Sequence, residues 1–239
     1  MLVEGDRELV LIDTGIGTRD IEDPARLGRG FRMLARPTLD PSMTALHQVA
    51  RLGYSPRDVG HIVLTHLDLD HAGGLADFPR AKVHVYDVEH DAAMRPDNLG
   101  ERLRYRPAQF EHGVDWVRHQ TIGERWYGLS GVRLVIDREA EILLVPLLGH
   151  SRGHAGVAVH DGGGWQLHCG DAYFNRDEVC THHRVGPLGL ALVRNAAAHD
   201  NAVRRRNVAR LRTLHRQARD VRLFSAHDPV ELDRARGTS

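Results

Sequence analysis

Residues 66–71 carry the side chains with the clearest chemical meaning. Two histidines and two aspartates stand in this stretch, after an apolar run and before two glycines: His66, Asp68, Asp70 and His71. Imidazoles and carboxylates bind borderline divalent ions such as Zn²⁺. Four such groups cannot all point the same way on a regular strand or helix, so the pattern favours a loop that curls around a dinuclear metal site. The alternative is a solvated polar loop, or an acidic helix start with incidental histidines.

Further landmarks follow along the chain, and together they resemble the metallo-β-lactamase superfamily. The loop is similar to the Thr-His-x-His-x-Asp-His signature of that family. The other landmarks lie at residues 11–15, 149–154, 169–171 and 225–228. Their fixed order, over roughly residues 3 to 230, makes the signal much more specific than any one motif. One position departs from the family, because its second histidine is replaced here by Asp68.

The resemblance implies a ligand set for two divalent ions. The first ion would be held by His66, Asp68 and His150, the second by Asp70, His71 and His227, and Asp171 would bridge both. The ligands outside the loop, His150, Asp171 and His227, each follow an apolar run. If these runs are strands, the three side chains lie at strand ends and can converge on one rim of a sheet, which agrees with the ligand set. His154 is an alternative to His150. Asp13 corresponds to a family aspartate that orients the ligands, although a simple strand-ending turn is equally consistent with it.

The same resemblance implies hydrolytic chemistry. Two ions that share a water lower its pKa and hold a hydroxide in attacking position, while one ion polarises the substrate carbonyl or phosphoryl oxygen. Asp70 would orient the nucleophile or accept its proton. Tyr173 would donate a hydrogen bond to the substrate or leaving group, as a tyrosine near this position does in lactonase relatives, in a different register. We therefore predict catalytic roles for Asp70 and Tyr173.

Asp68 changes the charge of the expected centre. Two divalent ions contribute +4, three aspartates −3 and a hydroxide −1, so the cluster is about neutral, whereas a histidine at position 68 would leave it near +1. We hypothesise a less acidic metal-bound water, and greater tolerance of Mn²⁺ or Fe²⁺ in place of Zn²⁺. The alternative is that Asp68 does not bind and that only one ion is held.

The elements that must position these residues alternate between strands and helices. Residue patterns predict a strand hairpin within residues 1–12, with its turn at 4–7, and strands at 61–65, 81–86, 132–136 and 141–148. They also predict strands at 156–160 and 165–169 joined by a hairpin turn at 161–164, and a strand at 221–225. Helices are predicted at 40–52, 87–94, 198–220 and 229–236. Residues 95–130 give no clear pattern, and 172–197 read as a loop-rich insertion. This order fits one domain over residues 1–239 with the α/β four-layer αβ/βα sandwich that the resemblance implies. Only twelve residues precede Asp13, so the amino-terminal edge strand of that fold is expected to be missing or rebuilt.

Length and charge narrow the possible classes of protein. The 239 residues suit a single large α/β domain, and the formal net charge of zero gives no reason to expect a nucleic-acid or membrane partner. No apolar run approaches the about 20 residues that span a bilayer, and the first residues do not resemble a signal peptide. We predict a cytoplasmic monomer or homodimer acting on a small molecule.

The leading functional hypothesis is metal-dependent hydrolysis of a lactone, thioester or carboxylic ester, because the loop and the chain length are similar to the lactonase and glyoxalase-II-like branches of the family. A phosphodiesterase or nuclease is a second possibility, and it would need a basic groove. A non-haem iron oxidoreductase could also use a carboxylate-rich site. A binding protein without activity is a further alternative.

Overall fold

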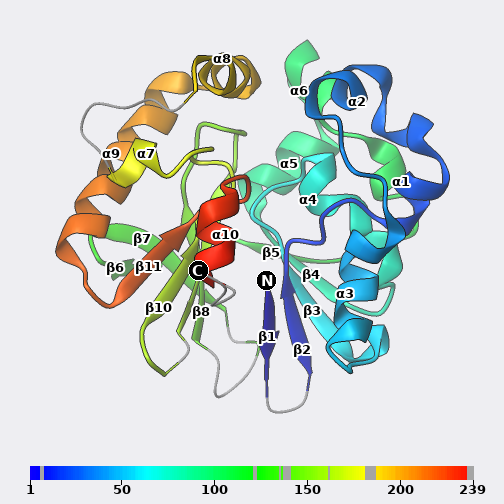
Figure 1. Ribbon diagram of the computed structural model, residues 1–239, viewed down its shortest axis with the longest axis horizontal. Helices are drawn as coiled ribbons and strands as arrows, with labels where there is room; N and C mark the ends of the chain where they lie inside the picture. Colours follow the sequence, from blue (N-terminus) through cyan, green and yellow to red (C-terminus); the bar gives the residue numbers. More distant parts are fainter. Residues whose placement is uncertain are drawn as a thin grey trace. The chain divides into compact units, whose positions relative to one another are not determined.

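A computed structural model of the chain describes residues 1–5, 8–120, 123–134, 136, 141–160, 162–180 and 187–235. It divides into two compact units (Figure 1). The first unit comprises Met1–Val85 and His90–Arg118, and the second comprises Tyr86–Glu89 and His119–Ser239. The single domain expected over residues 1–239 stays a prediction.

The first sheet has five strands in the order β1-β2-β3-β4-β5. Their bounds are β1 Leu2–Glu4, β2 Leu9–Ile12, β3 Val59–Val63, β4 Lys82–Tyr86 and β5 Asp115–His119. β1 pairs with β2 antiparallel, whereas β2, β3 and β4 run parallel. Because the carboxyl ends of parallel strands meet at one edge of a sheet, the residues that follow β2 and β3 come together there.

Short helices connect these strands. They are α1 Thr18–Glu22, α2 Arg29–Ala35, α3 Ala45–Arg51, α4 Leu69–Ala72, α5 Asp87–Met94 and α6 Leu99–Arg104, with 3₁₀ turns at Pro24–Leu27, Pro41–Met43, Pro56–Asp58, Gly73–Asp77 and Pro107–Gln109. The core of this unit joins the apolar residues of β2, β3 and β4 to Val49 of α3 and to Leu64 and Leu67 in the loop after β3. Burial of Leu64 and Leu67 fixes that loop at both sides of His66.

The second sheet has six strands in the order β11-β10-β9-β8-β7-β6. Their bounds are β6 Glu124–Trp126, β7 Leu129–Leu134, β8 Glu141–Pro146, β9 Ala155–His160, β10 Trp165–His168 and β11 Val221–Phe224. Strands β6 to β10 pair antiparallel, and β11 lies parallel to β10. The residues after β10 and after β11 therefore emerge at the same edge of the sheet.

The described residues from His119 onward form the helices α7 Asp177–Cys180, α8 Leu188–Ala197, α9 Asn201–Gln217 and α10 Pro229–Ala235. The apolar stripe of α9, formed by Val208, Leu211 and Leu214, packs into the core with Val145 and Leu167 of the sheet. Figure 1 shows α7 and α9 beside one another at this sheet. The helix predicted at 198–220 is thus present as α9, with its apolar stripe buried.

The structure corrects some of the expected elements. The helix predicted at 40–52 is a 3₁₀ turn followed by α3, because Thr44 between them has an extended backbone and its side chain accepts a hydrogen bond from the backbone N–H of His47. The segment without a clear pattern contains α6, β5 and β6, and the expected loop-rich insertion contains α7 and α8. Parts of the hairpin turns predicted at 4–7 and 161–164 and of the strand predicted at 132–136 lie outside the described residues. Among the described residues, no helix has the length and apolar composition that crossing a membrane requires.

Candidate metal centre

In the first unit, the loop after β3 brings its four predicted ligands together. Ligand atoms of His66 and Asp68, of His66 and His71, and of Asp70 and His71 each lie within 4.8 Å of one another. The rings of His66 and His71 have centroids 4.0 Å apart, and both are buried. The loop achieves this because the short helix α4 begins directly after Asp68 and turns the following side chains back.

Asp13, which follows β2, holds this loop in place. Its carboxylate accepts hydrogen bonds from the backbone N–H and the hydroxyl of Thr65, both at 2.8 Å, and lies 2.8 Å from Nδ1 of His71. Contact at Nδ1 leaves Nε2 of His71 as the nitrogen that a metal would use. The expected contact between Asp13 and a ligand is therefore present. Asp13 also ends its strand in a left-handed conformation, with φ of 52°.

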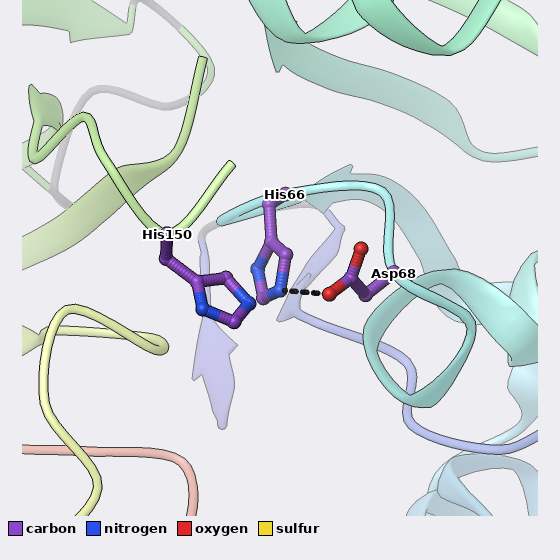
Figure 2. A group of neighbouring side chains, drawn as sticks. All are labelled: His66, Asp68 and His150. Atoms are coloured by element: carbon purple, nitrogen blue, oxygen red, sulfur yellow. Dashed lines mark ion pairs between the residues drawn. The ribbon is translucent and has the colours of Figure 1, made fainter. Parts of the chain in front are cut away.

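An arginine that the sequence did not single out contacts one of these ligands. Arg104, the last residue of α6, donates to Asp68 from Nε at 2.6 Å and from Nη2 at 2.9 Å. Oδ2 of Asp68 also lies 3.4 Å from Nε2 of His66. Figure 2 shows this ion pair between His66 and Asp68, both of which lie in the loop after β3. No sequence signal predicts the pairing with Arg104, which lies in a segment without periodicity.

In the second unit, Asp171 lies between the two histidines predicted to share a metal with it. Its carboxylate oxygens lie 3.3 Å from Nε2 of His150 and 3.2 Å from Nε2 of His227. Asp171 follows β10 and His227 follows β11, so the parallel pairing of these strands brings the two side chains together. The three ligands predicted in this unit therefore converge, as the position of a bridging aspartate requires.

His154 is engaged by the backbone through both ring nitrogens. Nδ1 lies 3.0 Å from the carbonyl oxygen of Leu147, and Nε2 accepts a hydrogen bond of 2.9 Å from the N–H of Asp171. A carbonyl oxygen can only accept, so Nδ1 carries the proton. This arrangement favours His150 over His154 as the ligand and gives His154 the task of fixing the backbone at Asp171.

Tyr173 lies in the core of the second unit. Its hydroxyl donates to the carboxylate of Glu231, with both oxygens at 3.1 Å. Burial, followed by the nearby ionisable groups of Cys169 and Glu231, raises the pKa of Tyr173 well above its ordinary value. The ring of Phe174 packs against both His150 and His227. The catalytic role expected for Tyr173 stays a prediction, since its hydroxyl is bonded to Glu231 here.

Asp228, next to His227, connects two segments of the second unit. Its carboxylate accepts from the backbone N–H and the guanidinium of Arg176 and from the N–H of Glu231. Burial acts to raise the pKa of Asp228, but these hydrogen bonds and the charge of Arg176 outweigh it and lower the pKa below its ordinary value. Asp228 thus stays charged and holds the chain just after His227.

The chemistry of these donors fits a divalent metal. The predicted set contains four imidazoles and three carboxylates, which is a nitrogen and oxygen set without thiolate. His66, His71, His150 and Asp171 are buried. Buried groups of this kind are normally paired or bound to metal, because burying an isolated charge is costly. The set suits Zn²⁺, and its carboxylates also suit Mn²⁺ or Fe²⁺.

Comparison with known proteins identifies the family. The family model described as the Metallo-beta-lactamase superfamily matches residues 1–214. The chain belongs to this superfamily. The α/β fold and the resemblance predicted from the five landmarks are thereby confirmed, as is the expected class of enzyme, a metallo-hydrolase, at the level of the family.

The chain is similar to several individual members of the superfamily, one named only as a probable metallo-hydrolase and others named as lactonases. The probable metallo-hydrolase Rv2300c of Mycobacterium tuberculosis is 43% identical, over 100% of this chain and 77% of its own length. The N-acyl homoserine lactonase AttM of Agrobacterium fabrum is 28% identical, over 62% of this chain and 54% of its own. A solved structure of an N-acyl homoserine lactone hydrolase, with the product N-hexanoyl-L-homoserine at its catalytic metal centre, has a TM-score of 0.67 and 20% identity, over 98% of this chain and 82% of that one. The last similarity shows the fold alone.

Proposed function

We propose that this superfamily member is a metal-dependent hydrolase of an ester-like bond in a small molecule, such as a lactone, thioester or carboxylic ester. The observation that carries the proposal is the convergence of the predicted ligands in each unit, four around the loop after β3 and three around Asp171. The similarity to named lactonases supports the choice of an ester-like bond. It does not select one lactone among many.

We assign two divalent ions to these ligands, with Zn²⁺ the first choice and Mn²⁺ or Fe²⁺ as alternatives. One ion would bind His66, Asp68 and His150, the other Asp70, His71 and His227, and Asp171 would bind both. When bound, such ions supply an activated water as nucleophile and a Lewis acid for the substrate carbonyl.

The side chains of the chain have separate tasks in this proposal. Asp70, half-buried beside His71, would orient the nucleophile or accept its proton. Asp13 and His154 would hold ligands in position. Tyr173 would reach a substrate only if its hydroxyl left Glu231, so Tyr173→Phe tests its role: a loss confined to kcat would support catalysis, and a loss of stability alone would indicate a structural bond.

Elemental analysis combined with a substrate panel tests the proposal. The native chain should contain about two divalent ions per protein and hydrolyse members of a panel of lactones, thioesters and carboxylic esters, with phosphodiesters as the comparison class. Asp171→Ala should lose metal and about a hundredfold or more of the activity. Asp115→Ala, an exposed aspartate in β5, is the matched control and should retain both. A native chain that takes up no divalent ion, or that cleaves only phosphodiesters, would contradict the proposal. We also propose a cytoplasmic monomer or homodimer, which sedimentation and fractionation would test.

A further inference from the structure

We propose that Asp68 and Arg104 act as one unit toward the first metal, so that the pair, and not Asp68 alone, stands where the family has a histidine. Arg104 is then a positioning residue: it touches no reacting atom, but it orients the Asp68 carboxylate and cancels its charge. This inference rests on the proposed function, because it assigns a role relative to the metal ions placed there.

The contact between the two side chains has the geometry of a strong ion pair. Nε and Nη2 of Arg104 donate to the two different oxygens of Asp68, at 2.6 and 2.9 Å. Such a two-pronged contact fixes the plane of the carboxylate as well as its position. Both side chains are largely shielded, with 15% of Arg104 and 17% of Asp68 exposed. Shielding from water strengthens the pair compared with an exposed ion pair.

The arginine is itself held in place by the segment that carries it. The side chain of Asn98 caps the start of α6 by accepting from the N–H of Glu101. The Glu101 carboxylate accepts from the N–H of Asp97. Directly after Arg104, Tyr105 is buried in the core of the first unit. These anchors on either side mean that Arg104 reaches Asp68 from a fixed backbone position.

The pair still leaves Asp68 able to bind a metal. A carboxylate has about four lone-pair sites, and a two-pronged arginine uses two of them. Oδ2 of Asp68 lies 3.4 Å from Nε2 of His66, which is another predicted ligand of the same ion. We therefore assign Oδ2, the oxygen beside His66, to the metal, although this oxygen also accepts from Nη2 of Arg104. Oδ1 accepts from Nε of Arg104.

The pair also restores the charge that the family's histidine would give. A carboxylate in place of a neutral imidazole lowers the charge of the centre by one unit, and the guanidinium returns that unit. The neutral cluster deduced from the sequence counted Asp68 without Arg104. With both residues included, the pKa of a metal-bound water and the preference for one metal over another should remain close to those of a site with histidine at position 68.

A double-mutant cycle read by zinc affinity tests the inference. Metal-free protein is titrated with Zn²⁺ in competition with a chromophoric chelator, in four forms: native, Asp68→His, Arg104→Gln and the double variant. In Asp68→His, the guanidinium faces the metal without the Asp68 carboxylate, so zinc affinity should fall about tenfold or more. Adding Arg104→Gln should restore it to within about threefold of the native value, whereas Arg104→Gln alone should leave affinity unchanged or weaken it.

The controls separate this coupling from other causes. Arg102→Gln, exposed on the same helix, removes a charge without touching Asp68 and should leave zinc affinity unchanged. If Asp68→His does not fold, Asp68→Asn with and without Arg104→Gln gives the same test. An equal effect of Arg104→Gln in the presence and absence of Asp68 would overturn the inference while leaving the metal site standing. A native chain that binds no zinc would overturn the proposed function, and the inference with it.

Discussion

His154 links two backbone groups near the predicted bridging ligand, and its replacement should affect both stability and metal binding. His154→Ala leaves the buried N–H of Asp171 and the carbonyl of Leu147 without this side chain. An unsatisfied buried group costs about 1–3 kcal/mol, so we expect a loss of stability of that order in denaturant unfolding. Zinc affinity should also fall about tenfold, because Asp171 is less well held.

His215→Ala is the matched control for this variant. His215 is exposed on α9, and its removal should change neither property. If His154→Ala loses stability but binds zinc as the native chain does, His154 has a structural role only.

Glu231 gives the chain a predictable dependence of stability on pH. Its carboxylate accepts from the hydroxyl of Tyr173 and from the N–H of Ser225 in a buried position. Burial raises the pKa of Glu231 to about 7, despite the opposing hydrogen bonds. The folded chain therefore keeps a proton that the unfolded chain releases near pH 4.5.

Because the folded state binds more protons in this window, the stability contributed by Glu231 falls as the pH rises from about 5 to about 7. Glu231→Gln removes this titration. The stability of the metal-free native chain should decline relative to Glu231→Gln between pH 5 and pH 8, by up to about 3 kcal/mol. Urea unfolding of both proteins at several pH values measures the difference, and parallel stability curves would show that the carboxyl titrates normally.

Among the secondary-structure elements, the amino-terminal turn of α9 packs closely against the backbone of Gly149, which follows β8 and precedes His150. Gly149 has a φ of 121°, a backbone conformation that residues with a side chain rarely adopt. A Cβ atom there would lie 2.4 Å from the backbone nitrogen of Arg204 in α9. The N–H groups of His199 and Asp200 donate to the carbonyls of His150 and Gly149, so the approach is close on both sides.

Gly149→Ala should therefore destabilise the chain by about 2 kcal/mol or more, since it combines backbone strain with a clash against main chain. Gly189→Ala in α8 is the control, because its Cβ would meet no atom within 4 Å. That change should be neutral or slightly stabilising, as alanine favours helix. Thermal unfolding of the two variants gives the comparison, and equal melting temperatures would contradict the packing argument.

The elements also explain what the sequence could predict. Apolar runs predict strands, so the sequence could place Asp171 after β10 and His227 after β11, at strand ends. Their role as metal ligands, which the family resemblance implies, stays a prediction. The break at Thr44 depends on one side chain capping a helix, which periodicity does not detect. The contact of Arg104 with Asp68 joins residues 36 positions apart, one of them in a segment without periodicity. Such a contact is set by tertiary packing and has no local signal.

For the whole molecule, the similarity to the family extends over most of the chain, whereas the substrate is determined by a small number of local segments. Nearly all of the sequence aligns with a solved lactone hydrolase structure, yet only 20% of the aligned residues are identical. We expect the residues that contact a substrate in segments 16–40, 95–130 and 172–197, where the sequence pattern is weakest. A shared fold can support different substrates because the loops that contact them vary independently of the core.

Metal binding should stabilise the chain as a whole. The proposed ligands come from positions as far apart in the sequence as His66 and His227, so only the folded chain can assemble them. A ligand that binds only the folded state stabilises it by about 2.7 kcal/mol at a hundred times its dissociation constant. For a chain of this length, each kcal/mol corresponds to about 2–4 °C in melting temperature.

Removal of metal by a chelator should thus lower the melting temperature by about 5–10 °C, and added Zn²⁺ should restore it. Asp171→Ala, which lacks the proposed shared ligand, should show a much smaller shift, whereas Asp115→Ala should respond like the native chain. An equal response of all three proteins would mean that the chelator acts elsewhere than at the proposed ligands.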